Sequence, residues 1–177
     1  MGKLFSLSML VGALFLAAGG VGQAQAPAAP NPLDVVPDKM PFDLPFGAPI
    51  AADEAKKVIA AAEAEAKKRN WKMNIAVVDW SGSLVAFERM DGAQIASIAI
   101  SQHKARTAAI YRRETVLFER GIQGGNNYLL TLDDVIGSRG GIPLVADGKI
   151  IGAIGCSGGT GSQDEVVAKA GAAVVNK

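Results

Sequence analysis

The chain has 177 residues, with 18 lysines and arginines, 17 aspartates and glutamates, and a single histidine. A near-neutral chain without a basic run lacks the positive surface that nucleic-acid binding requires, so no nucleic-acid partner is expected. The length suits one ordinary domain with a buried core, preceded by shorter segments.

The first 26 residues have the pattern of an export signal. Lys3 supplies the positive start, and residues 4–18 form an apolar run that is short for a membrane span. Small residues follow, so cleavage is expected after Ala24 or Ala26. We therefore expect a signal peptide over residues 1–26 and a periplasmic or secreted protein, not an integral membrane protein. A membrane anchor or a buried core helix is the alternative interpretation of the same run.

Residues 27–50 form a proline-rich segment between the signal and the domain. They hold seven of the eight prolines in the chain. Proline fixes φ and removes a backbone donor, so the segment is predicted to be an extended linker or arm. Its apolar residues Phe42, Leu44 and Phe46 are suited to packing on a neighbouring surface.

The domain is expected at residues 51–177, and its first half is predicted to fold as helix, hairpin and helix. Helix-forming alanine, lysine and glutamate dominate the first segment, and β-branched runs separated by a Ser-Gly turn follow it. The expected elements are a helix at 52–68, strands at 74–79 and 84–90, a helix at 97–112 and one or two further turns at 115–121.

The second half repeats the hairpin pattern with more glycine. Asp147-Gly148 between two apolar runs is a strong hairpin signal, and Ser162 followed by Glu165 has the form of a capping box. The expected elements are a further strand at 135–138, strands at 141–145 and 149–155, and a helix at 163–175. Hairpins without crossover connections indicate an α+β fold with an antiparallel sheet covered by helices.

Several motifs resemble, in order, those of the GlcG/HbpS-like family, which includes haem-degrading and haem-binding proteins. The resemblance covers about residues 51–175, and the joint order of the motifs is more specific than any one of them. It implies a profilin-like fold, a five-stranded antiparallel sheet flanked by helices, and a homo-oligomer. The matching motifs are IAVVD at 75–79, SGSLVAFERMDG at 81–92, KARTAA at 104–109, GGIPLVADG at 140–148, GAIGCSGGT at 152–160 and QDE at 163–165.

The resemblance also implies a function. Exported members of the family are associated with haem binding, haem degradation or iron handling. Other members serve small-molecule pathways, such as glycolate operons, or form the carboxy-terminal domains of cobalamin adenosyltransferases. We therefore expect an exported haem-binding oligomeric protein, with an accessory protein or enzyme acting on a small organic acid or cofactor as the alternative.

The residues themselves exclude most familiar catalytic sites. One histidine and one cysteine cannot assemble an ordinary structural zinc site, and no phosphate-binding Walker sequence is present. A Ser-His-Asp triad would have to use His103. Cys156 lies in an apolar run, which favours a small buried hydrophobe over a redox thiol. The sequence therefore assigns no catalytic residue.

His103 is the residue best suited to hold haem iron, because imidazole is the commonest axial ligand. Thr107 and Tyr111 follow at helical spacing, and small neighbours leave room for a flat macrocycle. Lys104 leads a group of cations suited to the propionates. The cofactor-binding set is thus His103, Lys104, Thr107 and Tyr111, with His103 as the metal ligand and Tyr111 or Met90 as replacements. A solvated surface histidine is the alternative interpretation.

A glycine-rich turn at 155–161 is the second candidate site. A strand-to-helix turn exposes backbone N–H groups that can hold a carboxylate or phosphate. Ser157, Gly158, Gly159 and Thr160 would form this anion-binding turn. A tight turn capped by Ser162 explains the same residues without a ligand.

The charged residues of the matching motifs are expected to form salt bridges or subunit contacts. Asp164 and Glu165 are adjacent on a helix and point about 100° apart, so they do not form an acid–base pair. Iron binding by surface carboxylates is a weaker interpretation, and a scaffold without any ligand is a third class of function. The set comprises Asp79, Arg89, Asp91, Lys104, Asp164 and Glu165.

Overall fold

The computed structural model describes residue 31 and residues 34–176. The chain divides into two compact units, and the second, residues 39–177, contains the domain. The expected signal peptide at 1–26 lies outside the described residues. Among the described residues, no helix is long and apolar enough to cross a membrane. The elements are α1 (Ala52–Lys68), β1 (Asn74–Asp79), β2 (Leu84–Arg89), α2 (Ala96–Ile110), α3 (Val116–Gln123), η2 (Asn127–Thr131), β3 (Gly141–Ala146), β4 (Lys149–Ser157) and α4 (Gly161–Ala172).

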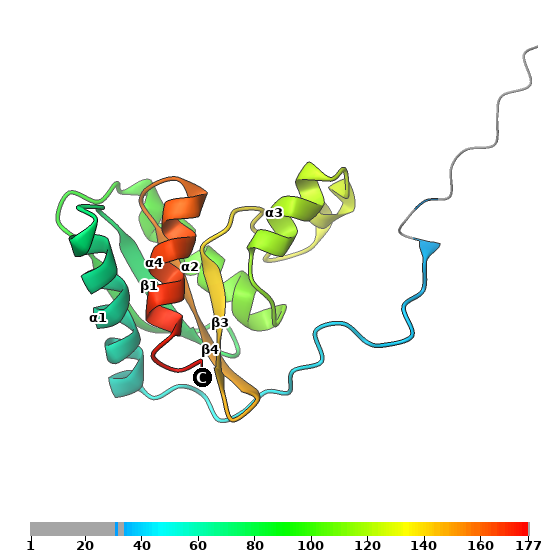
Figure 1. Ribbon diagram of the computed structural model, residues 1–177, viewed down its shortest axis with the longest axis horizontal. Helices are drawn as coiled ribbons and strands as arrows, with labels where there is room; N and C mark the ends of the chain where they lie inside the picture. Colours follow the sequence, from blue (N-terminus) through cyan, green and yellow to red (C-terminus); the bar gives the residue numbers. More distant parts are fainter. Residues whose placement is uncertain (1–30, 32–33, 177) are drawn as a thin grey trace, which may run out of the picture. The chain divides into compact units, whose positions relative to one another are not determined.

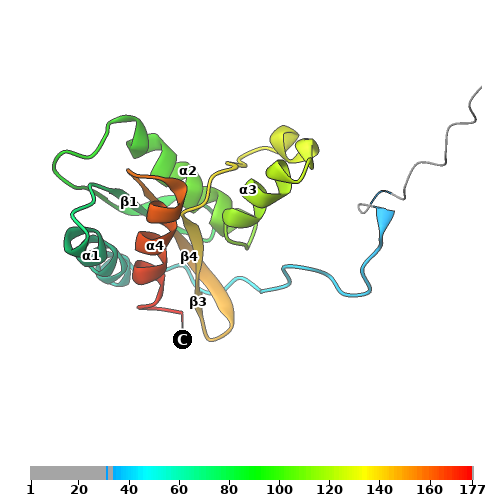
Figure 2. The same cartoon turned by 45° about the horizontal axis from the view of Figure 1, so that its top comes forward.

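An antiparallel sheet in the order β2-β1-β4-β3 lies between two layers of helices (Figure 1). Helices α1 and α4 cover one face and α2 covers the other, while α3 and η2 lie away from α1 (Figures 1 and 2). The α+β expectation and both predicted hairpins are confirmed. Asp147 and Gly148 both have positive φ, as a two-residue hairpin turn requires.

The described sheet has four strands, so the expectation of five was wrong. Residues 135–138, expected to add a strand, are irregular, and side chains bind backbone N–H groups within the segment and directly after it. Ile136 N–H donates to Thr107 Oγ1 and Arg139 N–H donates to Glu119 Oε2. A segment held in this way has no strand partner to pair with.

The two faces of the central strand β1 pack into different cores. Ile75 and Val77 face α1 and α4, while Ala76 and Val78 face α2. The core beneath α2 consists largely of alanine, so this helix lies close to the sheet. At Gly155 an added Cβ would overlap the backbone of α2, which explains the glycine there.

Helix α4 begins two residues earlier than the sequence suggested. Thr160, not Ser162, is the N-cap: its hydroxyl accepts from Gln163 N–H, and Gln163 Oε1 accepts from Thr160 N–H. The capping box is therefore Thr160–Gln163. Helix α4 therefore begins within the glycine-rich turn, at Gly161.

Residues 39–50 of the proline-rich segment belong to the same compact unit as the domain and pack on it. Phe46 forms a parallel bridge with Ile150, and its ring lies 5.7 Å from that of Trp80. The guanidinium of Arg113 lies 3.5 Å from the centre of the Phe42 ring. From Lys39 onward the segment therefore belongs to the compact unit.

Candidate functional site

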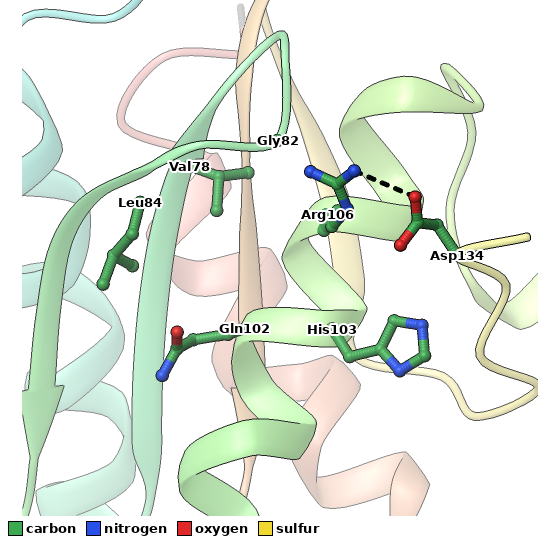
Figure 3. Close-up of a pocket in the computed structure, with 7 residues that line it drawn as sticks. All are labelled: Val78, Gly82, Leu84, Gln102, His103, Arg106 and Asp134. Atoms are coloured by element: carbon green, nitrogen blue, oxygen red, sulfur yellow. Dashed lines mark hydrogen bonds and ion pairs between the residues drawn. The ribbon is translucent and has the colours of Figure 1, made fainter.

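His103 lines a pocket of about 310 Å³ formed by α2, the β1–β2 hairpin and Asp134. The alanines of α2 face the sheet, which leaves His103 half-buried at the pocket (Figure 3). Its imidazole makes no hydrogen bond with any residue that the structure describes, so its ring nitrogens are free to bind a ligand. The lining residues are Val78, Gly82, Leu84, Gln102, His103, Arg106 and Asp134.

An ion pair closes one side of this pocket. Arg106 Nη2 lies 2.9 Å from Asp134 Oδ2, and Figure 3 shows the two side chains meeting above His103. The hydrogen bond from Arg106 lowers the pKa of Asp134, and the nearby His103 lowers it further. Gly82 has a φ of +85°, and an added Cβ would lie 2.8 Å from Arg106 Cγ. The hairpin turn thus makes room for the arginine.

Thr107 and Tyr111 position the loop that carries Asp134. Buried Thr107 donates from Oγ1 to Asp134 O at 2.6 Å, and the Tyr111 hydroxyl donates to Asp133 O at 2.7 Å. Both residues lie on the α2 face of His103, one and two turns further along. His103, Thr107 and the C-cap Tyr111 thus follow one side of α2, but of the four predicted cofactor-binding residues only His103 lines the pocket.

Lys104, the fourth, lies elsewhere. It is only 1% exposed, and its Nζ lies 2.7 Å from Asp164 Oδ2 in a buried ion pair. It does not line the His103 pocket. Arg106 is the cation that lies beside the imidazole instead.

The glycine-rich turn holds an internal carboxylate. Gly158 and Gly159 both donate their N–H groups to Asp164 Oδ1 at 3.0 Å. Thr160 caps α4, and the Ser157 hydroxyl donates to Ser97 Oγ. An external anion would have to displace Asp164, so the predicted anion site has lost its main donors to the protein itself.

The replacement iron ligands already have other contacts. Met90 is 7% exposed and belongs to the core beneath α1 and α4. The Tyr111 hydroxyl is engaged with Asp133, and the Tyr111 ring packs edge-on against Phe118 at 5.3 Å. Of the three candidates, His103 is the one that lines the pocket.

The remaining charged residues of the motifs divide between salt bridges and solvent. Glu165 lies 3.4 Å from Arg139 and 2.6 Å from Lys169, whereas the adjacent Asp164 pairs with Lys104. Asp79 accepts hydrogen bonds from Ser81 and Ser83 in the hairpin turn, whereas Arg89 and Asp91 are exposed. Within residues 34–176, no three His, Cys, Asp or Glu side chains are placed to hold a metal ion.

Sequence reasoning missed the parts of the pocket that come from outside α2. Asp134 follows Leu132-Asp133 in an irregular loop and meets Arg106 across 28 positions of sequence. No local pattern signals such a contact. Gly82 carried a usable signal, because a glycine in a tight hairpin turn often has positive φ.

Comparison with known proteins identifies the family of this chain. Residues 50–173 match the family model described as "Haem degrading protein HbpS-like". The chain is 49% identical over 103 residues to Protein GlcG of Escherichia coli K12, an alignment that covers 58% of this chain and 77% of that protein.

Solved structures agree with this match. A double mutant of HbpS from Streptomyces reticuli has a TM-score of 0.68 at 28% identity, covering 87% of this chain and 99% of HbpS. A complex of PduOC with haem has a TM-score of 0.66 at 26% identity, covering 72% of this chain and 96% of PduOC. The chain therefore belongs to the HbpS-like family, a haem-related family.

Proposed function

We propose that the protein is an exported, oligomeric haem-binding protein and that the His103 pocket receives the iron-bearing ring. The observation that carries the proposal is the half-buried imidazole of His103, which lines a pocket and has no hydrogen-bond partner among the described residues. A half-buried imidazole without a protein partner is accessible to a ligand, and imidazole is a common axial ligand of haem iron.

The lining residues have the chemistry that haem binding needs, and the pocket is large enough for part of the ring. Val78 and Leu84 offer apolar contact, and Arg106 offers a cation within reach of a propionate. A volume of about 310 Å³ is at the lower end for ligand pockets, which are roughly 300–1,000 Å³. The pocket would therefore cover one edge of the ring, with the rest against solvent or a second copy of the chain.

The chain's own residues would have separate roles in this site. His103 would donate a ring nitrogen to the iron, and bound haem would supply the redox-active metal. Arg106 would exchange part of its contact with Asp134 for a propionate. Thr107 and Tyr111 would hold the 133–136 loop in place as positioning residues.

Haem titration into the purified mature protein tests the proposal. We expect a saturable Soret change in the wild type and a shifted or weakened band in His103→Ala. Gln102→Ala is the matched control, because Gln102 lines the same pocket and cannot serve as an axial ligand. A Soret change identical in His103→Ala would overturn the ligand assignment.

The other outcomes test the function itself. No saturable Soret change would overturn haem binding for this protein. Thermal stabilisation by a small anion, without any response to haem, would support the alternative of an accessory protein or enzyme for a small organic acid.

Export and oligomerisation need separate measurements. The mass of the protein recovered from the periplasm or medium should correspond to cleavage after Ala24 or Ala26. Light scattering on the mature protein should give a mass that is a multiple of one chain. Retention of residues 1–26 in the cytoplasm would contradict export.

A further inference from the structure

A second pocket lies between the proline-rich segment, α3 and the edge strand β3, apart from the His103 pocket. Its volume is about 460 Å³. It shares no lining residue with the His103 pocket. The lining residues are Phe42, Leu44, Arg112, Arg113, Glu114, Val116, Leu117, Arg120, Ile142, Pro143, Val145 and Asn176.

The walls of this pocket are largely aliphatic. Leu44 comes from the proline-rich segment, Val116 and Leu117 from α3, and Ile142 and Val145 from β3. Leu117 is 42% exposed, which leaves apolar surface open to a ligand. Such walls suit a flexible hydrocarbon chain of moderate length.

Three arginines at the pocket have no carboxylate partner among the described residues. Arg112 Nη1 donates only to Leu44 O, Arg113 Nε donates only to Tyr111 O, and Arg120 makes no described side-chain hydrogen bond. Each guanidinium therefore retains donors. By contrast, Arg69, Arg106 and Arg139 each pair with a carboxylate.

The local charge is not neutralised by the one acid at the pocket. Glu114 lies 3.6 Å from Lys169, whose nearer partner is Glu165 at 2.6 Å, so this single acid stands against three arginines. Arg113 lies against Phe42, and burial lowers the pKa of its guanidinium, with the charge of Arg112 lowering it further. Unpaired cations beside apolar walls favour a ligand that has both an anionic and an apolar part.

We infer that this pocket binds a medium-chain aliphatic carboxylate, with the carboxylate at Arg112, Arg113 and Arg120 and the chain against the aliphatic walls. Arginine forms paired hydrogen bonds with a carboxylate, so the head group is recognised by geometry as well as by charge. The site is separate from the His103 pocket and does not depend on haem binding there.

Calorimetric titration of the mature protein with decanoate tests the inference. We expect saturable binding of decanoate, with acetate and 1-decanol each binding more weakly by about tenfold or more, since each lacks one of the two parts. Arg112→Gln should weaken decanoate binding by about tenfold or more. Leu117→Asp should also weaken decanoate binding, because it places a charge in the aliphatic wall. Leu117 is exposed, so this variant is expected to fold.

Matched controls separate this site from general effects. Arg89→Gln removes an exposed arginine that lies at neither pocket and should leave decanoate binding unchanged. His103→Ala should also bind decanoate as the wild type does, whatever it does to haem. Absence of saturable binding, equal binding of 1-decanol, or equal binding by Arg112→Gln would each overturn the inference. If haem displaced decanoate competitively, the two ligands would share a site, and the inference of a separate site would be wrong.

Discussion

Lys104 and Asp164 form a buried ion pair that joins helices from opposite faces of the sheet. Their charged atoms lie 2.7 Å apart, and the side chains are 1% and 3% exposed. The second carboxylate oxygen accepts from the N–H groups of Gly158 and Gly159. Gly140 leaves room for the pair, because an added Cβ would lie 2.8 Å from Asp164 Cβ and 3.3 Å from Lys104 Nζ. One contact thus connects α2, α4 and the glycine-rich turn.

Asp164→Asn should destabilise the protein by about 3–5 kcal/mol, because it leaves the Lys104 ammonium buried without a countercharge. Urea unfolding at neutral pH measures the change. Lys56→Ala is the control: its pair with Asp53 is exposed and should contribute less than about 1 kcal/mol. Equal losses in the two variants would contradict a buried charge pair. A Lys104→Met, Asp164→Leu double variant should be milder than Asp164→Asn, because no charge is left buried.

Thr107→Val should loosen the loop that carries Asp134. The hydroxyl donates to Asp134 O and accepts from Ile136 N–H, and valine keeps the shape without either bond. The expected loss is about 1–3 kcal/mol. Hydrogen exchange should show faster exchange at the amide of Ile136. Unchanged protection there would mean that the side chain does not hold the loop.

The elements with local signals could be predicted from the sequence. The helix at 52–68 follows from its alanine, lysine and glutamate content, and the β3–β4 hairpin from Asp147-Gly148. Residues 135–138 have apolar character similar to a strand. They do not form one: Thr107, far away in sequence, accepts from the Ile136 N–H, and Glu119 accepts from the N–H of Arg139, directly after the segment.

The candidate site could be predicted only in part, because it too depends on contacts between residues far apart in sequence. His103 stands out as the single histidine on a predicted helix. The burial of Lys104 does not stand out, since lysine is almost never fully buried unless paired, and its partner Asp164 is 60 residues away. Asp134 reaches the pocket through tertiary contacts that no spacing reveals.

Asp79→Asn should destabilise the protein at neutral pH and have less effect in acid. Burial raises the pKa of Asp79, but hydrogen bonds from Ser81 and Ser83 outweigh it, so the pKa lies below its ordinary value of 3.8. A lowered pKa means that this carboxylate stabilises the fold above about pH 3.8 and loses that contribution as the pH falls through the lower folded value.

Urea unfolding of both proteins across pH measures this difference. The free energy of unfolding should fall by about 1 kcal/mol at pH 7, because the asparagine oxygen accepts hydrogen bonds from the same donors but more weakly than the carboxylate. The gap between wild type and Asp79→Asn should close as the pH falls below 3.8. A gap that widens in acid would contradict the lowered pKa.

Cys156 should be inert to thiol reagents in the native state. The side chain is 0% exposed on β4, burial raises the pKa of the thiol far above its ordinary value, and the charge of Asp164 raises it further. Since the thiolate is the reactive form, both access and ionisation oppose reaction. Disulfide exchange with a coloured aromatic disulfide at pH 8 should therefore proceed only through opening of the fold. Asp164→Asn, which favours opening, should react faster than the wild type, and full denaturation should expose one thiol. Rapid reaction of the native wild type would contradict the buried position of Cys156.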